Sequence, residues 1–236
     1  MKQNDAAGFE RTKTRIKELI FVPEAIPVFG ASLENALKMA TKSLKVQGPG
    51  PGDMLIDEAV HKLQLLRGTV FQRMVALVAP KEPLSVICHG DFWINNMLFR
   101  YDTNGKVEDV MLIDLQVARY GCLATDILHF LYTSLEPGLT VSHYEDLLEA
   151  YHESLSSTAM RLAPGAPPVT LEQVTDLVEE RALYGLLISF LLLPAVTAED
   201  TIVNEEFLDQ AADSLTPGYR KRVREIVLEF VDRGFI

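Results

Sequence analysis

Residues 86–116 read VICHGDFWINNMLFRYDTNGKVEDVMLIDLQ. The run Leu84–Cys88 predicts a short strand, and the runs Met97–Tyr101 and Val107–Ile113 predict two more. Asn104-Gly105, in the connection Asp102–Gly105, suits a hairpin turn because both residue types tolerate a positive φ. We therefore expect this segment to fold as strand, loop and β-hairpin.

The polar residues of this segment follow the order of a phosphoryl-transfer site. In the kinase template an Asp receives the proton of the attacking hydroxyl, an Asn five residues later binds magnesium, and a second Asp follows a hairpin. Asp91 is therefore the candidate base, and Asn96 and Asp114 are the candidate Mg²⁺ ligands. Singly, each could be a turn residue that bonds its own backbone. Their joint order around a hairpin favours catalysis.

Three neighbours of these residues have candidate supporting roles. We expect His89 to hold the backbone of the catalytic loop through hydrogen bonds, not to act as the base. Asp126 could accept amides from the loop or simply favour the N-terminus of its own helix. Trp93, the only tryptophan, could form a wall of the substrate site or pack in the core.

Composition limits the possible partners and compartments. The 236 residues carry 22 Lys and Arg against 33 Asp and Glu, a net charge of −11, which argues against nucleic acid or an anionic membrane surface. A small or neutral partner fits better, and nothing in the sequence indicates the oligomeric state. Two cysteines, Cys88 and Cys122, are too few for a disulfide framework and predict buried, reduced thiols.

No segment of the sequence is typical of a secretory signal or of a membrane-spanning helix. The first twenty residues mix charges of both signs and lack the apolar stretch of a secretory signal. The longest apolar run, LYGLLISFLLLPAV at 183–196, contains Pro194 and is shorter than the roughly 20 residues needed to span a bilayer. It predicts a helix buried on all sides. We expect a cytoplasmic protein without membrane insertion.

Helical patterns flank the central segment on both sides. Apolar residues three or four apart predict one helix over about 54–79, and Ser32 predicts the cap of an earlier helix. QGPGPGD at 47–53 predicts a linker between them. The residues expected to be buried in the earlier helix are Leu33, Ala36, Leu37, Ala40 and Leu44.

Helix starts are also visible after residue 122. Ser142 with Glu145, and Thr170 with Gln173, have the spacing of capping boxes. Thr216 followed by proline predicts a third start. The last helix is expected to bury Tyr219, Val223, Ile226, Val227 and Phe230. The predicted fold class is α+β, mainly helical, with one short hairpin at its chemical centre.

The strings CHGDFWINNMLFRYD, VMLIDLQVARYG and TDILHFLYTS resemble the ecdysteroid kinase-like (CHK kinase-like) family, which belongs with choline kinases and aminoglycoside phosphotransferases. The resemblance extends from about residue 1 to the end and is specific at 86–134. It implies that Asp91 is the catalytic Asp, that Asn96 and Asp114 bind metal, and that ATP and Mg²⁺ are the cofactors. Gln116 stands where related kinases often carry a second acidic residue, and Arg119 is a possible substrate or loop contact. Cys122-Leu123 departs from the Ser-Pro frequent in the family.

The resemblance also implies an architecture. We expect residues 1–236 to form a protein-kinase-like C-terminal lobe: a helical lead-in at 1–80, the catalytic loop and hairpin at 84–116, and a helical subdomain at 122–236. The N-terminal nucleotide-binding lobe is expected to be missing. The glycines at 48–52 alternate with prolines, which lack amide donors for phosphate, and no lysine before residue 80 lies in a strand-like run.

Two functions of different classes remain open at this point. One is ATP- and Mg²⁺-dependent phosphorylation of a small-molecule hydroxyl, on a steroid or another lipophilic alcohol, by a truncated C-terminal lobe. The other is a catalytically inactive pseudokinase or small-molecule-binding protein. A two-metal phosphoesterase would use His89-Gly-Asp91 with 231–234, but only two residues follow for its further ligands.

Overall fold

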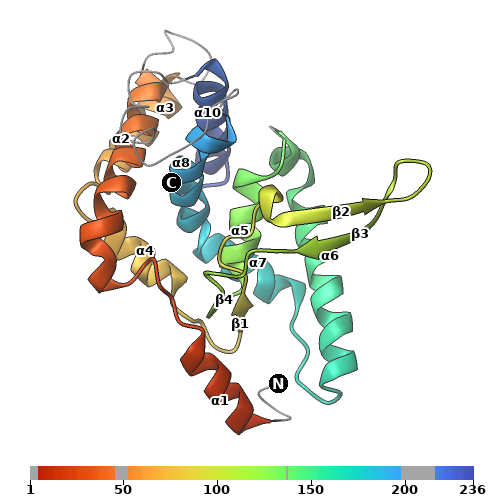
Figure 1. The fold of residues 1–236 in the computed structure, drawn as a ribbon. Coiled ribbons are helices and arrows are strands. Elements are labelled where there is room, and N and C mark those ends of the chain that lie inside the picture. The colour runs from red at the N-terminus through yellow and green to blue at the C-terminus, as the bar shows by residue number, and fades with distance from the viewer. Residues whose placement is uncertain (1–4, 46–52, 137, 198–215) are drawn as a thin grey trace.

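The computed structural model describes residues 5–45, 53–136, 138–197 and 216–236 (Figure 1). These residues form a mainly helical α+β fold, as predicted. The helices are α1 (Ala6–Arg15), α2 (Ala31–Lys45), α3 (Asp53–Gln64), α4 (Val70–Val78), α5 (Ala124–Thr133), α6 (Leu139–Leu162), α7 (Leu171–Glu180), α8 (Ala182–Val196) and α10 (Pro217–Asp232). Shorter helical turns occupy Pro23–Ala25, Ile26–Gly30 and Ile94–Asn96.

Helix α8 is the centre of the core. It packs against α2, α4, α5, α7 and α10, which explains why its sequence is apolar on every side (Figure 1). Gly185 lets α5 approach closely, because a Cβ at that position would lie 2.7 Å from the Tyr132 ring. Pro194 is accommodated in the last turn of α8. No helix within the described ranges is long and apolar enough to cross a membrane.

Two antiparallel pairs of strands make up the β structure of the described residues. The predicted strand before the loop is β1 (Ser85–Cys88), and the predicted hairpin is β2 (Met97–Tyr101) with β3 (Val107–Leu112). The strand β4 (Arg119–Cys122) was not predicted, and it pairs with β1 so that Ser85 lies opposite Cys122. Both cysteines are buried free thiols, as expected.

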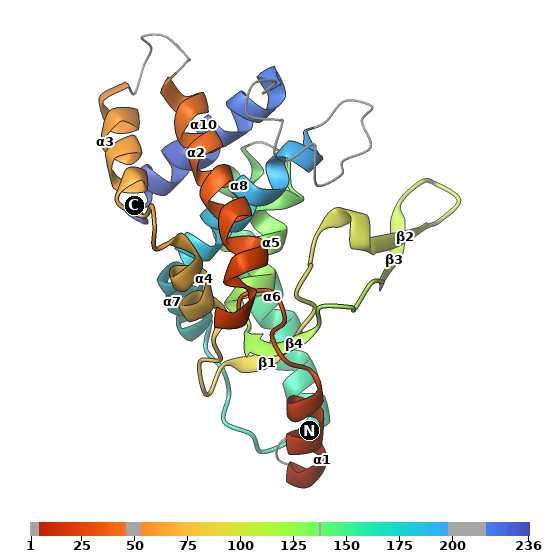
Figure 2. The same cartoon turned by 60° about the vertical axis from the view of Figure 1, so that its left-hand side comes forward.

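The hairpin projects away from the helices in both views (Figures 1 and 2). Gly105 has a φ of 78°, and Asn104 does not share that positive φ. The carboxylate of Asp102 instead accepts hydrogen bonds from the amides of Asn104 at 2.9 Å and Lys106 at 2.8 Å. The turn is therefore held by an Asp side chain together with one left-handed glycine.

The prediction of a single helix over 54–79 was wrong, because two helices occupy this range. The chain leaves the helix after Gln64 and starts α4 at Val70, with Gly68 between them at a φ of 75°. The Gly68 amide donates to the Glu34 carboxylate of α2 at 2.7 Å. Because the apolar spacing continues across the turn, periodicity alone could not reveal the break. The linker prediction at 47–52 lies outside the described residues.

Helix caps were predicted with mixed success. The Thr170–Gln173 capping box is present, and Thr216 accepts from the amide of Tyr219 as the cap of α10. The predicted buried residues of α2 and α10 are buried. Ser32 is not a cap, because α2 continues directly from the helical turn at Ile26–Gly30. Ser142 is not one either, because α6 begins at Leu139 and the Ser142 hydroxyl donates to Gly138 O.

Candidate functional site

The loop between β1 and β2 has a conformation fixed from two sides. Both carboxylate oxygens of Asp126 accept loop amides, from His89 at 2.6 Å and from Gly90 at 3.0 Å. Gly90 has a φ of 88°, and a Cβ there would lie 2.2 Å from Val117 O. Glycine is therefore required at this position. Asp126 was expected either to accept amides from the loop or to favour its own helix N-terminus, and the structure has the bonds to the loop.

Asp91 and Asn96 form a hydrogen-bonded pair. The Asn96 side-chain amide donates to Asp91 O at 2.9 Å and to Asp91 Oδ2 at 2.8 Å. Because the side-chain nitrogen of Asn96 makes both bonds, the side-chain oxygen remains available as an uncharged ligand for a metal ion. The Asp91 side chain is 28% exposed, so a hydroxyl group can reach it.

The end of the hairpin is tied to the same loop. Ile113 N donates to Asn96 O at 3.0 Å, and His89 Nε2 donates to Ile113 O at 2.8 Å. These bonds fix the residue directly before Asp114. The His89 ring was expected to bond the backbone of the catalytic loop, and its bond goes instead to the end of the hairpin. Asp114 itself has a φ of 63°, which is uncommon outside glycine and is typical of functional turns. Asp91 and Asn96 thus bond each other, and Asp114 directly follows the residue that is bonded to their loop.

Three further candidates differ in what they contact. Arg119 is 1% exposed, donates to Gly90 O at 3.2 Å and pairs with Glu18 at 2.8 Å, so it contacts the loop and cannot reach a substrate. Gln116 is exposed and lies 3.4 Å from Asp114 Oδ2. Trp93 is half-buried. A ring that is half-buried two residues from Asp91 is compatible with either role proposed for Trp93.

Sequence reasoning missed two residues that support this unit. Glu18 accepts the amides of Leu19, Ile20 and Phe21 and holds Arg119, and nothing local to its sequence marks that role. His129 lies on α5 with Nε2 3.8 Å from Asp91 Oδ1. His129 follows Asp126 by three residues, so both lie on one face of the helix. The possible contact of Asp126 with the loop could therefore have indicated that His129 also faces the loop.

The buried thiol beside the loop is not a nucleophile. Burial raises the pKa of Cys88 to about 12, and the negative charge of Asp126 adds to this effect. The thiol therefore stays protonated at neutral pH. Thiol chemistry is not part of this site.

The described residues contain no cluster of three or more His, Cys, Asp or Glu side chains arranged to hold a metal ion. Mg²⁺ does not need such a cluster, because it commonly takes one or two carboxylates and completes its shell with phosphate oxygens and water. The carbonyl oxygen of Asn96 and the exposed carboxylate of Asp114 are suitable donors. The donor chemistry therefore fits Mg²⁺ bound together with a nucleotide.

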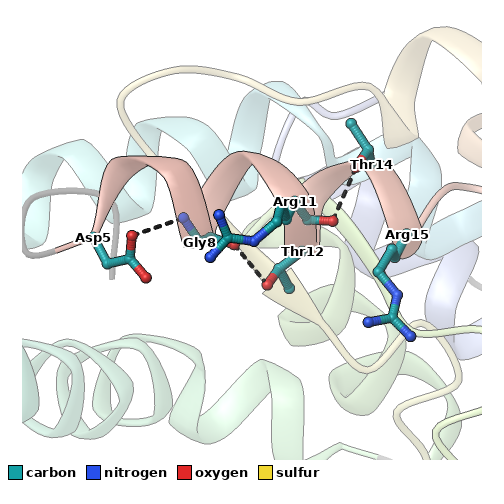
Figure 3. A pocket seen from close by; sticks show the side chains of 6 residues that line it. All are labelled: Asp5, Gly8, Arg11, Thr12, Thr14 and Arg15. Atoms are coloured by element: carbon teal, nitrogen blue, oxygen red, sulfur yellow. Dashed lines mark hydrogen bonds between the residues drawn. The ribbon is translucent and has the colours of Figure 1, made fainter.

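A pocket on α1 is not an alternative site (Figure 3). Its polar groups serve the helix itself: Asp5 caps Gly8 N at 2.7 Å, and Thr12 donates to Gly8 O at 2.9 Å. None of its lining residues belongs to the catalytic loop. The helix is instead anchored by Phe9, whose ring packs edge-on against Tyr120 of β4 at 5.4 Å.

The family model named ecdysteroid kinase-like family matches residues 1–163. The chain belongs to the ecdysteroid kinase-like family. The matched range contains the whole catalytic loop, the hairpin and α5, and it ends before the C-terminal limit expected from the sequence. The family is one of kinase-type phosphotransferases that act on small molecules. No protein in the curated set matches this chain.

Proposed function

We propose that this chain supplies the catalytic half of an ATP- and Mg²⁺-dependent phosphotransferase that acts on a small-molecule hydroxyl. Asp91 is the base in this proposal. It is exposed enough to meet a substrate, and Asn96 holds one of its oxygens at 2.8 Å. Positioning of this kind is most of what phosphoryl transfer requires from a protein. The Asp91–Asn96 pair, whose loop is bonded to Ile113 directly before Asp114, is the observation that supports the proposal.

Each residue has a defined task in the proposed reaction. Asp91 would orient the substrate hydroxyl and accept its proton as the oxygen bonds to the terminal phosphorus of ATP, while the bond from that phosphorus to the ADP oxygen breaks and ADP leaves. Asn96 Oδ1 and Asp114 would hold Mg²⁺, which would supply positive charge to the nucleotide phosphates. His89 and Asp126 keep the loop in register with the end of the hairpin through the bonds described above.

The nucleotide needs a surface that the described residues lack. Within the described ranges the β structure is limited to β1, β4 and the hairpin, with no glycine-rich hairpin and no strand Lys paired to a helix Glu. Large apolar side chains of the hairpin and its ends are also uncovered: Ile94, Leu98, Tyr101, Val107, Val110, Met111, Leu112 and Leu115. Exposed apolar patches of this kind mark interaction sites. We therefore propose that the chain is a kinase-like C-terminal lobe whose hairpin is covered by a separate nucleotide-binding lobe.

A lipophilic alcohol is the substrate class that best suits the loop. Trp93 and Ile94 stand two and three residues from Asp91, and Ile94 is 41% exposed. Phe92 packs on Phe130 with ring centroids 5.7 Å apart. Apolar and aromatic groups beside the base favour a steroid or a similar molecule over a highly charged one.

The alternative function is that of an inactive small-molecule-binding protein. Such a protein would retain the apolar loop without binding ATP tightly. Titration calorimetry with Mg²⁺-ATP tests whether the chain needs a second lobe to bind the nucleotide, and the phosphorylation screen below separates the two functions. We expect weak or no binding by the chain alone, and micromolar affinity would contradict the proposal that a second lobe is needed.

The function itself is tested by a phosphorylation screen. Hydroxylated steroids and other lipophilic alcohols are incubated with Mg²⁺-ATP and the chain, with and without a nucleotide-binding lobe of the family fused before it. We expect transfer of the terminal phosphate only from the fusion. Binding of an alcohol without transfer by the fusion would favour the inactive binding protein.

A further inference from the structure

His129 is a buried histidine without a hydrogen-bond partner. Its side chain is 2% exposed in the middle of α5, and neither ring nitrogen has a partner among the described residues. Nearly all buried polar groups in proteins are paired, because an unpaired one lowers stability. An orphaned ring at this position therefore needs an explanation.

One carboxylate oxygen of Asp91, the candidate base, lies close to the ring. His129 Nε2 lies 3.8 Å from Asp91 Oδ1, while Asn96 holds the other oxygen, Oδ2, at 2.8 Å. The ring thus faces the one oxygen of Asp91 that Asn96 does not hold. A separation of 3.8 Å is too long for a hydrogen bond, but such contacts in unliganded sites often shorten when substrate binds.

The ring is neutral in this setting. Burial lowers the pKa of His129 to about 3, and the positive charge of Arg119 and the ring of His89 act in the same direction. The contact with Asp91 is therefore not an ion pair at neutral pH. A neutral imidazole carries one N–H and one lone pair, and a lone pair facing a carboxylate would be repelled. Protonation at Nε2 is the arrangement that suits Asp91.

Two other roles do not fit. His129 cannot be the base, because its buried ring is out of reach of a substrate hydroxyl and binds a proton only in strong acid. It cannot relay a proton to solvent either, because its second nitrogen is also buried and unpaired. What remains is an orienting contact with Asp91.

We propose that His129 is a positioning residue that donates its Nε2–H to Asp91 Oδ1 and, together with Asn96, fixes the carboxylate for its reaction with the substrate hydroxyl. The proposal rests on the proposed function, since it takes Asp91 as the base. Asn96 acts from the loop and His129 from α5, so the carboxylate is held from two independent elements. A fixed carboxylate needs no reorganisation when the hydroxyl arrives.

The first test needs no turnover. In the full chain labelled with ¹⁵N-histidine, long-range ¹H–¹⁵N spectra report which ring nitrogen carries the proton. We expect His129 to be protonated at Nε2, and the Asp91→Ala chain to show a mixture of the two forms. His152, whose Nε2 bonds Val169 O at 2.8 Å, serves as the internal control and should not change. Protonation at Nδ1 in the wild type, or an unchanged spectrum in Asp91→Ala, overturns the proposal.

The second test uses turnover by the lobe fusion. His129→Phe keeps an apolar ring in place, and His129→Gln restores a neutral donor near the position of Nε2. We expect His129→Phe to lower kcat about tenfold with the KM for ATP within about twofold, and His129→Gln to recover most of the loss. Equal kcat for His129→Phe and wild type, or no recovery in His129→Gln, overturns the proposal. If the wild-type fusion has no turnover, the proposed function fails and the spectra alone decide the role of His129.

Discussion

The catalytic loop and the hairpin adjoin each other in sequence but differ in how they are held. The loop is held by polar groups from distant segments: Asp126 of α5 and Arg119 of β4 bond its backbone, and Glu18, from the segment before α2, pairs with Arg119. The hairpin bonds mainly to itself, and its β3 strand is exposed along its whole length. Polar groups hold the catalytic loop in place, whereas apolar side chains of the hairpin are exposed to solvent.

This difference separates two requirements of a kinase. In the proposed function, the groups that hold the candidate base and metal ligands come from this chain, because Asn96 bonds Asp91 and His89 bonds the residue before Asp114. The nucleotide needs a covering surface, and the hairpin presents the apolar side chains that such a surface would bury. In the proposed function, the chain itself holds the loop, and the hairpin is the part that a nucleotide-binding lobe would cover.

The largest expected contrast comes from two glycines that both have a positive φ. Gly90→Ala should lower the free energy of unfolding by about 4 kcal/mol, because strain in the left-handed region adds to a backbone clash with Val117 O. Gly105→Ala has nothing within 4 Å and should cost only about 1 kcal/mol. Urea unfolding measures both. Equal losses would mean that the loop is not tightly packed.

Removing one arginine from each region gives the next contrast. Arg119→Met should cost about 3 kcal/mol, because it leaves Gly90 O and the buried side of Glu18 without their partner. Arg100 of the hairpin pairs with Glu108 and Asp109 at an exposed site. Arg100→Met should therefore change stability by less than about 0.5 kcal/mol. Similar effects in thermal unfolding would contradict the distinction between the regions.

A charge placed on the hairpin tests whether its apolar surface is uncovered. Met111 is 64% exposed, so Met111→Glu should change the free energy of unfolding by no more than about 0.5 kcal/mol while lowering the binding of a hydrophobic dye. Met160 on α6 is similarly exposed at 74%, and Met160→Glu is the matched control. A large loss of stability in Met111→Glu would show that the hairpin is already covered.

The smallest effect concerns pH at the hairpin turn. Hydrogen bonds from the backbone of Lys106 and Asn104 hold the pKa of Asp102 below its ordinary value of 3.8. Because the folded pKa is lowered, the contribution of Asp102 is present above pH 3.8 and is lost as the pH falls through the lowered value. Exchange of the Lys106 amide should therefore lose protection in that range. The Asp102→Asn chain should lack this change.

The sequence predicted the features whose causes are local. Asn104-Gly105 between apolar runs gave the hairpin, and Thr170 with Gln173 gave a helix start, because turn and cap chemistry depend on neighbouring residues. β4 was missed because Arg119–Cys122 is short and its pairing with β1 bridges more than thirty residues of chain. Its stability comes from tertiary contacts that no local pattern encodes.

The candidate site divides in the same way. The positions of Asp91, Asn96 and Asp114 follow from motif spacing, and the structure joins them through backbone bonds near the hairpin. Their roles as base and metal ligands stay predictions. The spacing from Asp126 could have pointed to His129, but its distance from Asp91 depends on how α5 packs against the loop, which the sequence does not encode.

The most direct measurement of the central claim is the turnover of the lobe fusion with Asp91 replaced. Asp91→Asn keeps the size of the side chain but removes its capacity to take a proton, so kcat should fall about a thousandfold. Asp146→Asn, at an exposed position on α6, is the control and should stay within about twofold of wild type. Transfer of phosphate at the wild-type rate by the lobe fusion that carries Asp91→Asn would contradict the assignment of Asp91 as the base.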